Sequence, residues 1–223
     1  MGAIPDNISK VEFSPILPLI LAVCRRAVRF VPAGVTPNQI TLVSFLFALG
    51  SGASMYLASF NRWWFAIGVG SYFIHWFLDN LDGTLARTRG LTSERGFFLD
   101  LFLDALGYSA LFLGTAFSSY SVRFPLVALL ILVLLRELLM LHWMLLRQRF
   151  VMPVIGPSEL PAIVLVLVVL TAFWPRNLVR VGNVGFGWFD AAASLTAIAY
   201  AIDVAVSAVR LYHSLDPPTA APG

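Results

Sequence analysis

The chain has 223 residues, of which 59% are hydrophobic and 12% charged, and its mean hydropathy is +0.83. This composition excludes an ordinary soluble domain and indicates an integral membrane protein. The net charge of +3 comes without a basic stripe of the kind that binds DNA or RNA, and the single cysteine excludes an internal disulfide or a multi-cysteine metal site.

Residues 1–36 are predicted to form an N-terminal segment that lies on the membrane surface. The beginning, MGAIPDNISKVEF, lacks the layout of a signal peptide, and Asp6 stands where a myristoylation signal requires Ser or Thr. We therefore expect neither cleavage nor a lipid anchor. Residues 15–34 are apolar but short, and Arg25, Arg26 and Arg29 interrupt them. That pattern is typical of an interfacial amphipathic helix.

Residues 37–213 are predicted to form one all-α domain of six transmembrane helices. Apolar stretches of roughly 20 residues are long enough to cross a bilayer. The six stretches run approximately over 38–60, 62–86, 96–118, 124–148, 158–174 and 187–211. The tail, residues 214–223, is predicted to be disordered.

The basic residues predict the orientation of these spans. With the N-terminus inside, ten Lys and Arg side chains fall on the cytoplasmic side and four on the opposite side, as the positive-inside rule requires. The inner set is Lys10, Arg25, Arg26, Arg29, Arg87, Arg89, Arg95, Arg147, Arg149 and Arg210, and the outer set is Arg62, Arg123, Arg176 and Arg180. The junction of the second and third spans then opens at the cytoplasmic face.

Four aspartates occupy that junction: Asp79, Asp82, Asp100 and Asp104. On helices their spacings place the first two on one face and the last two on another, so that two carboxylate faces can converge. Charged groups at this depth are costly and indicate function. Clustered carboxylates repel each other unless a cation lies between them. Because no His or Cys cluster is nearby, the oxygen donors predict Mg²⁺ or Mn²⁺, with Ca²⁺ as a weaker alternative.

Small residues separate the acids, with Gly83 and Ala86 on the first face and Gly96 on the second. They leave room for a bulky group beside the metals, and Arg87 offers a guanidinium fork to phosphate. Together these features predict a site for a diphosphate-containing substrate. The structural alternative is that the acids pair with Arg87 and its basic neighbours as links between helices.

The run from Asp79 to Asp104 fits the pattern DxxDGxxARx8Gx3Dx3D at all eight fixed residues and resembles the CDP-alcohol phosphotransferase family. The resemblance implies an enzyme of the EC 2.7.8 type, in which residues 37–213 form the catalytic domain. Such an enzyme moves a substituted phosphate from a CDP-linked donor, most often CDP-diacylglycerol, to an alcohol hydroxyl, and CMP leaves.

The resemblance also assigns roles to the four acids. Asp79, Asp82 and Asp100 would be the main ligands of two Mg²⁺ or Mn²⁺ ions, and Asp104 would be a further ligand and the general base. The residues by themselves leave open which Asp is the base. The resemblance further implies a homodimer in a bilayer, with a bacterial inner membrane favoured over the endoplasmic reticulum and the active site at the cytoplasmic face.

A second stretch, GVTPNQIT, also resembles the family, and Pro37 suits the first turn of a helix that begins after Thr36. Asn38 and Thr41 are expected to contact the nucleotide, unless the stretch is only a capped helix start. The predicted CDP-binding set is Asn38, Thr41, Gly83, Ala86, Arg87 and Gly96.

Three residues are candidates for binding the acceptor alcohol. Arg136 and Glu137 stand near the middle of the fourth span, where they form either a buried structural bond or part of the acceptor pocket. Glu159, in GPSEL, could hold a cationic headgroup or favour a helix N-terminus. Asp203 is expected to bond across helices. The alternative activity is therefore transfer from CDP-choline or CDP-ethanolamine to diacylglycerol.

Two classes outside the family remain as alternatives. A membrane prenyltransferase also uses Asp-rich helices with magnesium and a diphosphate, but it needs more helices and leaves the Gly-x-x-Ala-Arg insert unexplained. A divalent cation transporter should place its acids near the bilayer midplane rather than near one face.

Overall fold

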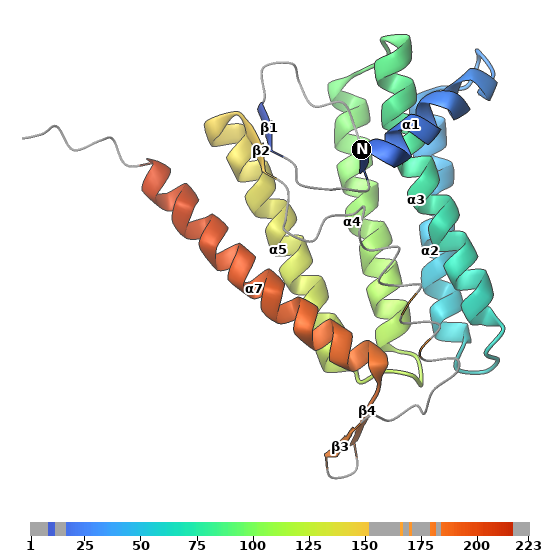
Figure 1. Cartoon of the computed structure of the whole chain (residues 1–223), viewed down its shortest axis with the longest axis vertical. Helices are drawn as coiled ribbons and strands as arrows, with labels where there is room; N and C mark the ends of the chain where they lie inside the picture. Colours follow the sequence, from blue (N-terminus) through green and yellow to red (C-terminus); the bar gives the residue numbers. More distant parts are fainter. Residues whose placement is uncertain are drawn as a thin grey trace, which may run out of the picture.

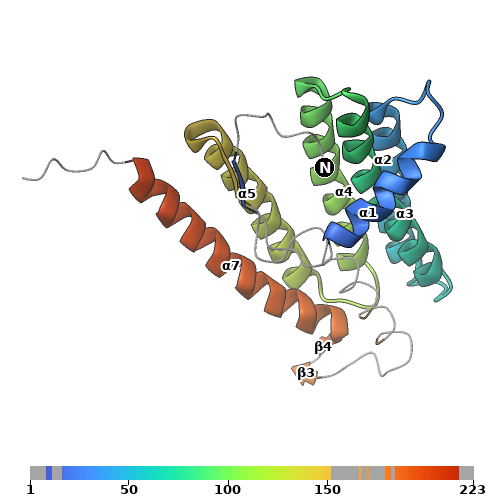
Figure 2. The same cartoon turned by 45° about the horizontal axis from the view of Figure 1, so that its top comes forward.

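The computed structural model describes residues 9–11, 17–151, 166, 170, 179–181 and 184–215. They form a bundle of long helices with a shorter helix, α1, lying obliquely against α3 near one end (Figures 1 and 2). The helices are α1 (Leu17–Ala27), the 3-10 turn η1 (Val28–Phe30), α2 (Pro37–Leu57), α3 (Trp64–Arg89), α4 (Glu94–Ala116), α5 (Arg123–Arg147) and α7 (Trp188–Leu215).

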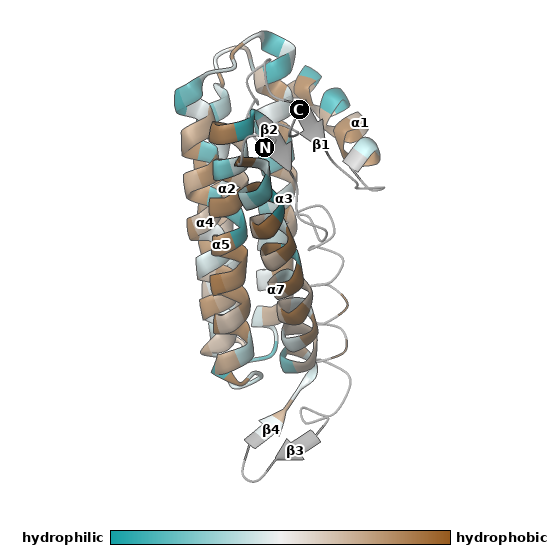
Figure 3. Ribbon diagram, turned by 90° about the vertical axis from the view of Figure 1, so that its left-hand side faces the viewer, coloured by the Kyte–Doolittle hydropathy of each residue, from teal (hydrophilic) through white to brown (hydrophobic). Residues whose placement is uncertain are grey.

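Four of the described helices, α2, α4, α5 and α7, are long and apolar enough to cross a membrane. Helix α3 has 26 residues but is not among them, because polar residues from His75 onward interrupt its apolar sequence. The predicted fifth span, 158–174, lies outside the described residues except for positions 166 and 170. A mostly helical membrane protein is thus confirmed, but the described part of the chain holds four candidate spans and not the predicted six. Figure 3 shows mostly hydrophobic residues along these helices, while many of the hydrophilic residues lie at the end of the bundle near α1.

Helices α2 and α4 approach each other to backbone contact at two glycines. A Cβ built on Gly114 would lie 2.0 Å from the carbonyl oxygen of Gly52, and one built on Gly52 would lie 2.3 Å from that of Ala110. Farther up the pair, a Cβ on Gly107 would lie 3.0 Å from Ala48. Residue numbers rise together along both helices, so they are parallel and their first turns lie at the same end of the bundle.

Buried serines fix the register of α3 against α2. Ser44 Oγ lies 2.9 Å from both the carbonyl oxygen and Nδ1 of His75, and Ser51 Oγ donates to the carbonyl oxygen of Gly68 at 2.9 Å. A buried hydroxyl is costly unless it is hydrogen-bonded, so a slip of either helix is unfavourable. Because α3 runs antiparallel to α2, its last turns lie beside the first turns of α2.

Hydrogen bonds join α5 and α7 from one end to the other. The pairs, in order, are Val122–Asp190, Arg136–Asp203, Trp143–Ser207 and Arg147–Ser214. The Arg136 Nε to Asp203 Oδ2 distance is 2.5 Å, which confirms the expected bond from Asp203 across helices. Since both sets of numbers rise together, α5 and α7 are parallel.

Helix α1 covers the last turns of α3 with one apolar face. Its Ile20 and Cys24 are buried in a cluster with Leu81 and Leu85 of α3. The other face exposes Leu19, Val23 and the arginines of η1 and α1. A helix within residues 15–34 is therefore present, and its burial on a membrane surface stays a prediction.

Two pairs of short strands were not predicted. Strand β1 (Ser9–Val11) pairs in parallel with β2 (Arg149–Val151), and β3 (Val179–Val181) pairs antiparallel with β4 (Val184–Phe186). Each strand has three residues, which is too short for an alternating pattern to appear in the sequence. The β1–β2 pair ties the N-terminal segment to the end of α5.

Candidate metal and nucleotide site

The acids are placed by the tight connection between α3 and α4. Helix α3 is capped by Gly90, whose φ of 65° is left-handed and therefore suits glycine. The N–H of Gly90 is directed back at the last turn of α3. Ser93 then caps α4 by accepting a hydrogen bond from the N–H of Gly96 at 3.1 Å. This short connection places the two acidic segments so that carboxylates of α3 and α4 converge.

Three of the four predicted acids form one cluster. Asp79, Asp100 and Asp104 each offer a carboxylate oxygen, and these oxygens all lie within 4.8 Å of one another. Asp100 is buried, and the other two are partly buried. Hard oxygen donors that converge from two helices at this spacing could hold a divalent cation.

The fourth acid, Asp82, faces α2. Its Oδ2 accepts a 2.6 Å hydrogen bond from Thr41 Oγ1, which also lies 3.1 Å from the carbonyl oxygen of Pro37. Asp82 and Thr41 are both buried, at 3% and 7% exposure. This bond links the predicted metal and nucleotide residues and holds the first turn of α2 against α3.

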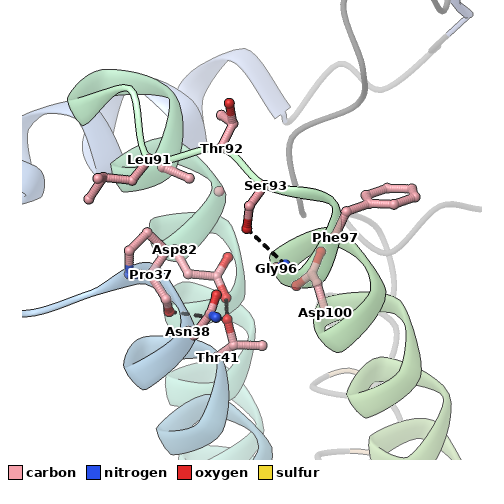
Figure 4. Close-up of a pocket in the computed structure, with 12 residues that line it drawn as sticks. Pro37, Asn38, Thr41, Asp82, Leu91, Thr92, Ser93, Gly96, Phe97 and Asp100 are labelled. Carbon is pink, nitrogen blue, oxygen red and sulfur yellow. Dashed lines mark hydrogen bonds between the residues drawn. The ribbon is translucent and has the colours of Figure 1, made fainter.

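A pocket lies directly beside these acids (Figure 4). It has an empty volume of about 290 Å³, part of which is open to solvent. Its walls are the first turns of α2, the last turns of α3, the α3–α4 connection and the first turns of α4. The predicted site residues that line it are Asn38, Thr41, Asp82, Gly83, Ala86, Gly96 and Asp100. The predicted nucleotide residues other than Arg87 are thus brought together around one cavity.

The start of α2 is capped as its sequence suggests. Thr36 Oγ1 accepts from the N–H of Gln39 at 3.4 Å, and Gln39 Oε1 accepts from the N–H of Thr36 at 2.9 Å. Residues 36–41 therefore form a capped helix start and also contribute to the pocket wall. A Cβ built on Gly96 would lie 3.1 Å from Asn38 Oδ1, so a side chain at position 96 would press on Asn38.

The remaining predicted residues either do not line the pocket or lie outside the described chain. Arg87 is exposed near the end of α3 and is not among the pocket-lining residues. Arg136 is 2% exposed and forms the ion pair with Asp203, while Glu137, its neighbour on α5, is partly buried. Glu159 lies outside the described residues. The roles of these four side chains stay predictions.

The residues of the α3–α4 connection were not predicted to belong to the site. Leu91, Thr92 and Ser93 all line the pocket. The signal that could have found them is Ser93 three residues before Gly96, a typical N-cap position in front of an apolar run. The contacts of Arg89 were not predicted either, because they join segments more than 50 residues apart.

Solved structures share this architecture. Two crystal structures of phosphatidylinositol phosphate synthase from Mycobacterium tuberculosis, one with CDP-DAG bound and one in complex with manganese and citrate, match with a TM-score of 0.67 and 17% identity. The first match covers 91% of this chain and 100% of that chain, and the second covers 90% and 93%. At this identity the likeness shows the fold.

A curated relative matches over a shorter stretch. Archaetidylinositol phosphate synthase from Pyrococcus horikoshii is 39% identical over 83 residues, which are 37% of this chain and 42% of the relative. The match therefore spans less than half of either protein. The sequence profile of CDP-alcohol phosphatidyltransferases, in contrast, matches residues 34–209. The chain belongs to the CDP-alcohol phosphatidyltransferase family.

Proposed function

We propose that this protein is a phospholipid-synthesising membrane transferase. It moves a substituted phosphate from a CDP-linked lipid, CDP-diacylglycerol above all, to an alcohol hydroxyl and releases CMP. The observation that carries this proposal is the convergence of Asp79, Asp100 and Asp104 within 4.8 Å, next to a pocket that Asp82 and Gly96 line. Family membership and the names of the similar synthases agree with this activity.

The donor set fits Mg²⁺ or Mn²⁺. All of the converging side chains are carboxylates, which are hard oxygen ligands. Asp79, Asp100 and Asp104 would hold one ion, and Asp82, which shares the pocket with Asp100, would help to hold a second. When bound, the ions would offset negative charge on the diphosphate.

Other side chains around the pocket would bind the nucleotide and assist the transfer. The floor at Gly83 and Gly96 leaves room for the nucleotide, and Asn38 would contact it from α2. Asp104 would accept the proton of the acceptor hydroxyl. The oxygen of that hydroxyl would at the same time form a bond to the phosphorus distal to cytidine. The bond from that phosphorus to the bridging oxygen breaks, and the electron pair leaves with CMP. Arg87 would contact a phosphate oxygen.

Helix directions support the six-span topology that forms part of the proposal. Helices α2 and α4 are parallel, so α3, which connects them in the chain, has to cross the membrane in the opposite direction. Helices α5 and α7 are also parallel, and α7 begins at the end of the bundle where α5 begins. The site would lie at the cytoplasmic face of a bacterial inner membrane, and the family also implies a homodimer, which mass measurement in lipid would test.

The experiment is CMP release by the purified protein in lipid with magnesium or manganese. CDP-diacylglycerol is tested against glycerol phosphate, inositol phosphate and serine, and CDP-choline and CDP-ethanolamine are tested against diacylglycerol. Release in the first set supports the proposal and identifies the acceptor, whereas release only in the second set would establish the aminoalcohol activity. If CMP neither forms nor protects the protein from heat, the transferase proposal is wrong, and the transporter and prenyltransferase alternatives gain weight.

A further inference from the structure

The last side chain of α3 reaches the segment that precedes α2. Arg89 Nη2 donates to the carbonyl oxygen of Val31 at 2.5 Å, and Nη1 donates to those of Pro32 and Val35 at 3.1 and 3.2 Å. One guanidinium thus holds three carbonyls of residues 31–35, a segment that has no helix or strand of its own. Such charge-assisted bonds are among the stronger hydrogen bonds in proteins.

Both ends of this contact lead directly into the walls of the pocket. On one side, residues 31–35 run into the Thr36 cap and then into Pro37 and Asn38, which line the pocket. On the other side, the backbone of Arg89 continues through Gly90 into residues 91–93, which line it from the opposite direction. The guanidinium therefore joins the two walls by a path that lies outside the cavity.

Apolar packing supports the same region from below. The buried cluster of α1 and α3 includes Ile40 of α2, and Val31 and Val35 of the 31–35 segment pack against it. Two polar links also join the walls: the bonds of Arg89 and the deeper Thr41–Asp82 bond. Arg89 therefore adds a polar link at the outer edge of the two walls to the packing that places Asn38.

We propose that Arg89 is a positioning residue that sets the width of the nucleotide pocket by tying the segment before α2 to the end of α3. This inference rests on the proposed function for the identity of the ligand, but not for the geometry. Arg89 lies outside the eight fixed residues of the acidic motif. A lysine would keep the charge but cannot present the planar fork that reaches three carbonyls at once.

The test compares Arg89→Lys with Arg29→Lys, a matched control at an exposed arginine of η1. We expect Arg89→Lys to raise the Kd for CMP and the KM for the CDP-linked donor about three- to thirtyfold, while kcat changes little. Methylguanidinium should restore CMP affinity to Arg89→Ala. The control should match the wild type. If the role of Arg89 were purely structural, Arg89→Lys would lower thermal stability but would not raise KM while leaving kcat unchanged.

A second measurement reports the geometry without any ligand. In a Cys24→Ala background, spin labels are placed at Gly34→Cys, where a Cβ meets no atom within 4 Å, and at exposed Glu94→Cys on α4. Arg89→Lys should broaden the distance distribution between the labels, and Arg29→Lys should not.

An unchanged distribution overturns the proposal, and so does a broadened distribution with unchanged CMP affinity, since Arg89 would then hold the segment without shaping the pocket. Failure of the wild type to bind CMP contradicts the proposed function instead, while the label distances still test whether Arg89 joins the two walls.

Discussion

The hydrogen bond between Thr41 and Asp82 allows a sharp test of the site geometry. Thr41→Val removes the hydroxyl but keeps the shape of the side chain, so the 2.6 Å bond to Asp82 Oδ2 is lost with little change in packing. Both residues are buried, and hydrogen bonds to charged groups are worth about 1.5–3 kcal/mol. For a chain of this size that corresponds to a fall in Tm of about 3–12 °C.

The assay is thermal unfolding of the metal-free protein in detergent, with Thr41→Ser as the control that keeps the hydroxyl. Addition of Mn²⁺ should reduce the difference between Thr41→Val and the wild type, because a bound cation compensates the Asp82 carboxylate. If Thr41→Val is as stable as the wild type without metal, or if Thr41→Ser is equally destabilised, the bond does not make the contribution that we assign to it.

Three further substitutions test other parts of the account. Asp104→Asn should abolish CMP release but keep metal-dependent binding of the CDP-linked donor, and retained turnover would remove Asp104 as the base. Gly114→Ala should destabilise the fold by about 1–3 kcal/mol, because its Cβ would lie 2.0 Å from the carbonyl oxygen of Gly52; Gly50→Ala, with its nearest atom 3.9 Å away, is the control. Asp190→Asn should cost about 1–3 kcal/mol in denaturation experiments, since the carboxylate accepts two backbone N–H bonds and an amide oxygen is a single acceptor atom. An Asp190→Asn protein of wild-type stability would show that this link between α5 and α7 is dispensable.

Local spacing made the acidic site predictable. Asp100 and Asp104 are four residues apart, and such residues must share a face once the segment is helical. The start of α2 was equally readable, because the Thr36 cap and Pro37 are local signals. These features depend on backbone geometry within one or two turns, which the sequence encodes directly.

Contacts between distant segments could not be predicted in the same way. The sequence does not identify the partners of Arg89 and Arg136: one binds loop carbonyls and the other forms a buried ion pair with Asp203. Each partner is set by the packing of helices that lie more than 50 residues apart in the chain. The close approach at Gly52 likewise depends on which helix lies opposite, and no periodic pattern specifies that neighbour.

Electron–nuclear double resonance on Mn²⁺ bound to the protein together with a CDP-linked donor tests whether metal and nucleotide share one site. We expect a hyperfine coupling between Mn²⁺ and the ³¹P nuclei of the diphosphate, because the cluster of Asp79, Asp100 and Asp104 adjoins the pocket that Asp82 and Gly96 line. The coupling should disappear in Asp100→Asn. Mn²⁺ that binds without ³¹P coupling, or a coupling that survives Asp100→Asn, would contradict a shared site for metal and nucleotide.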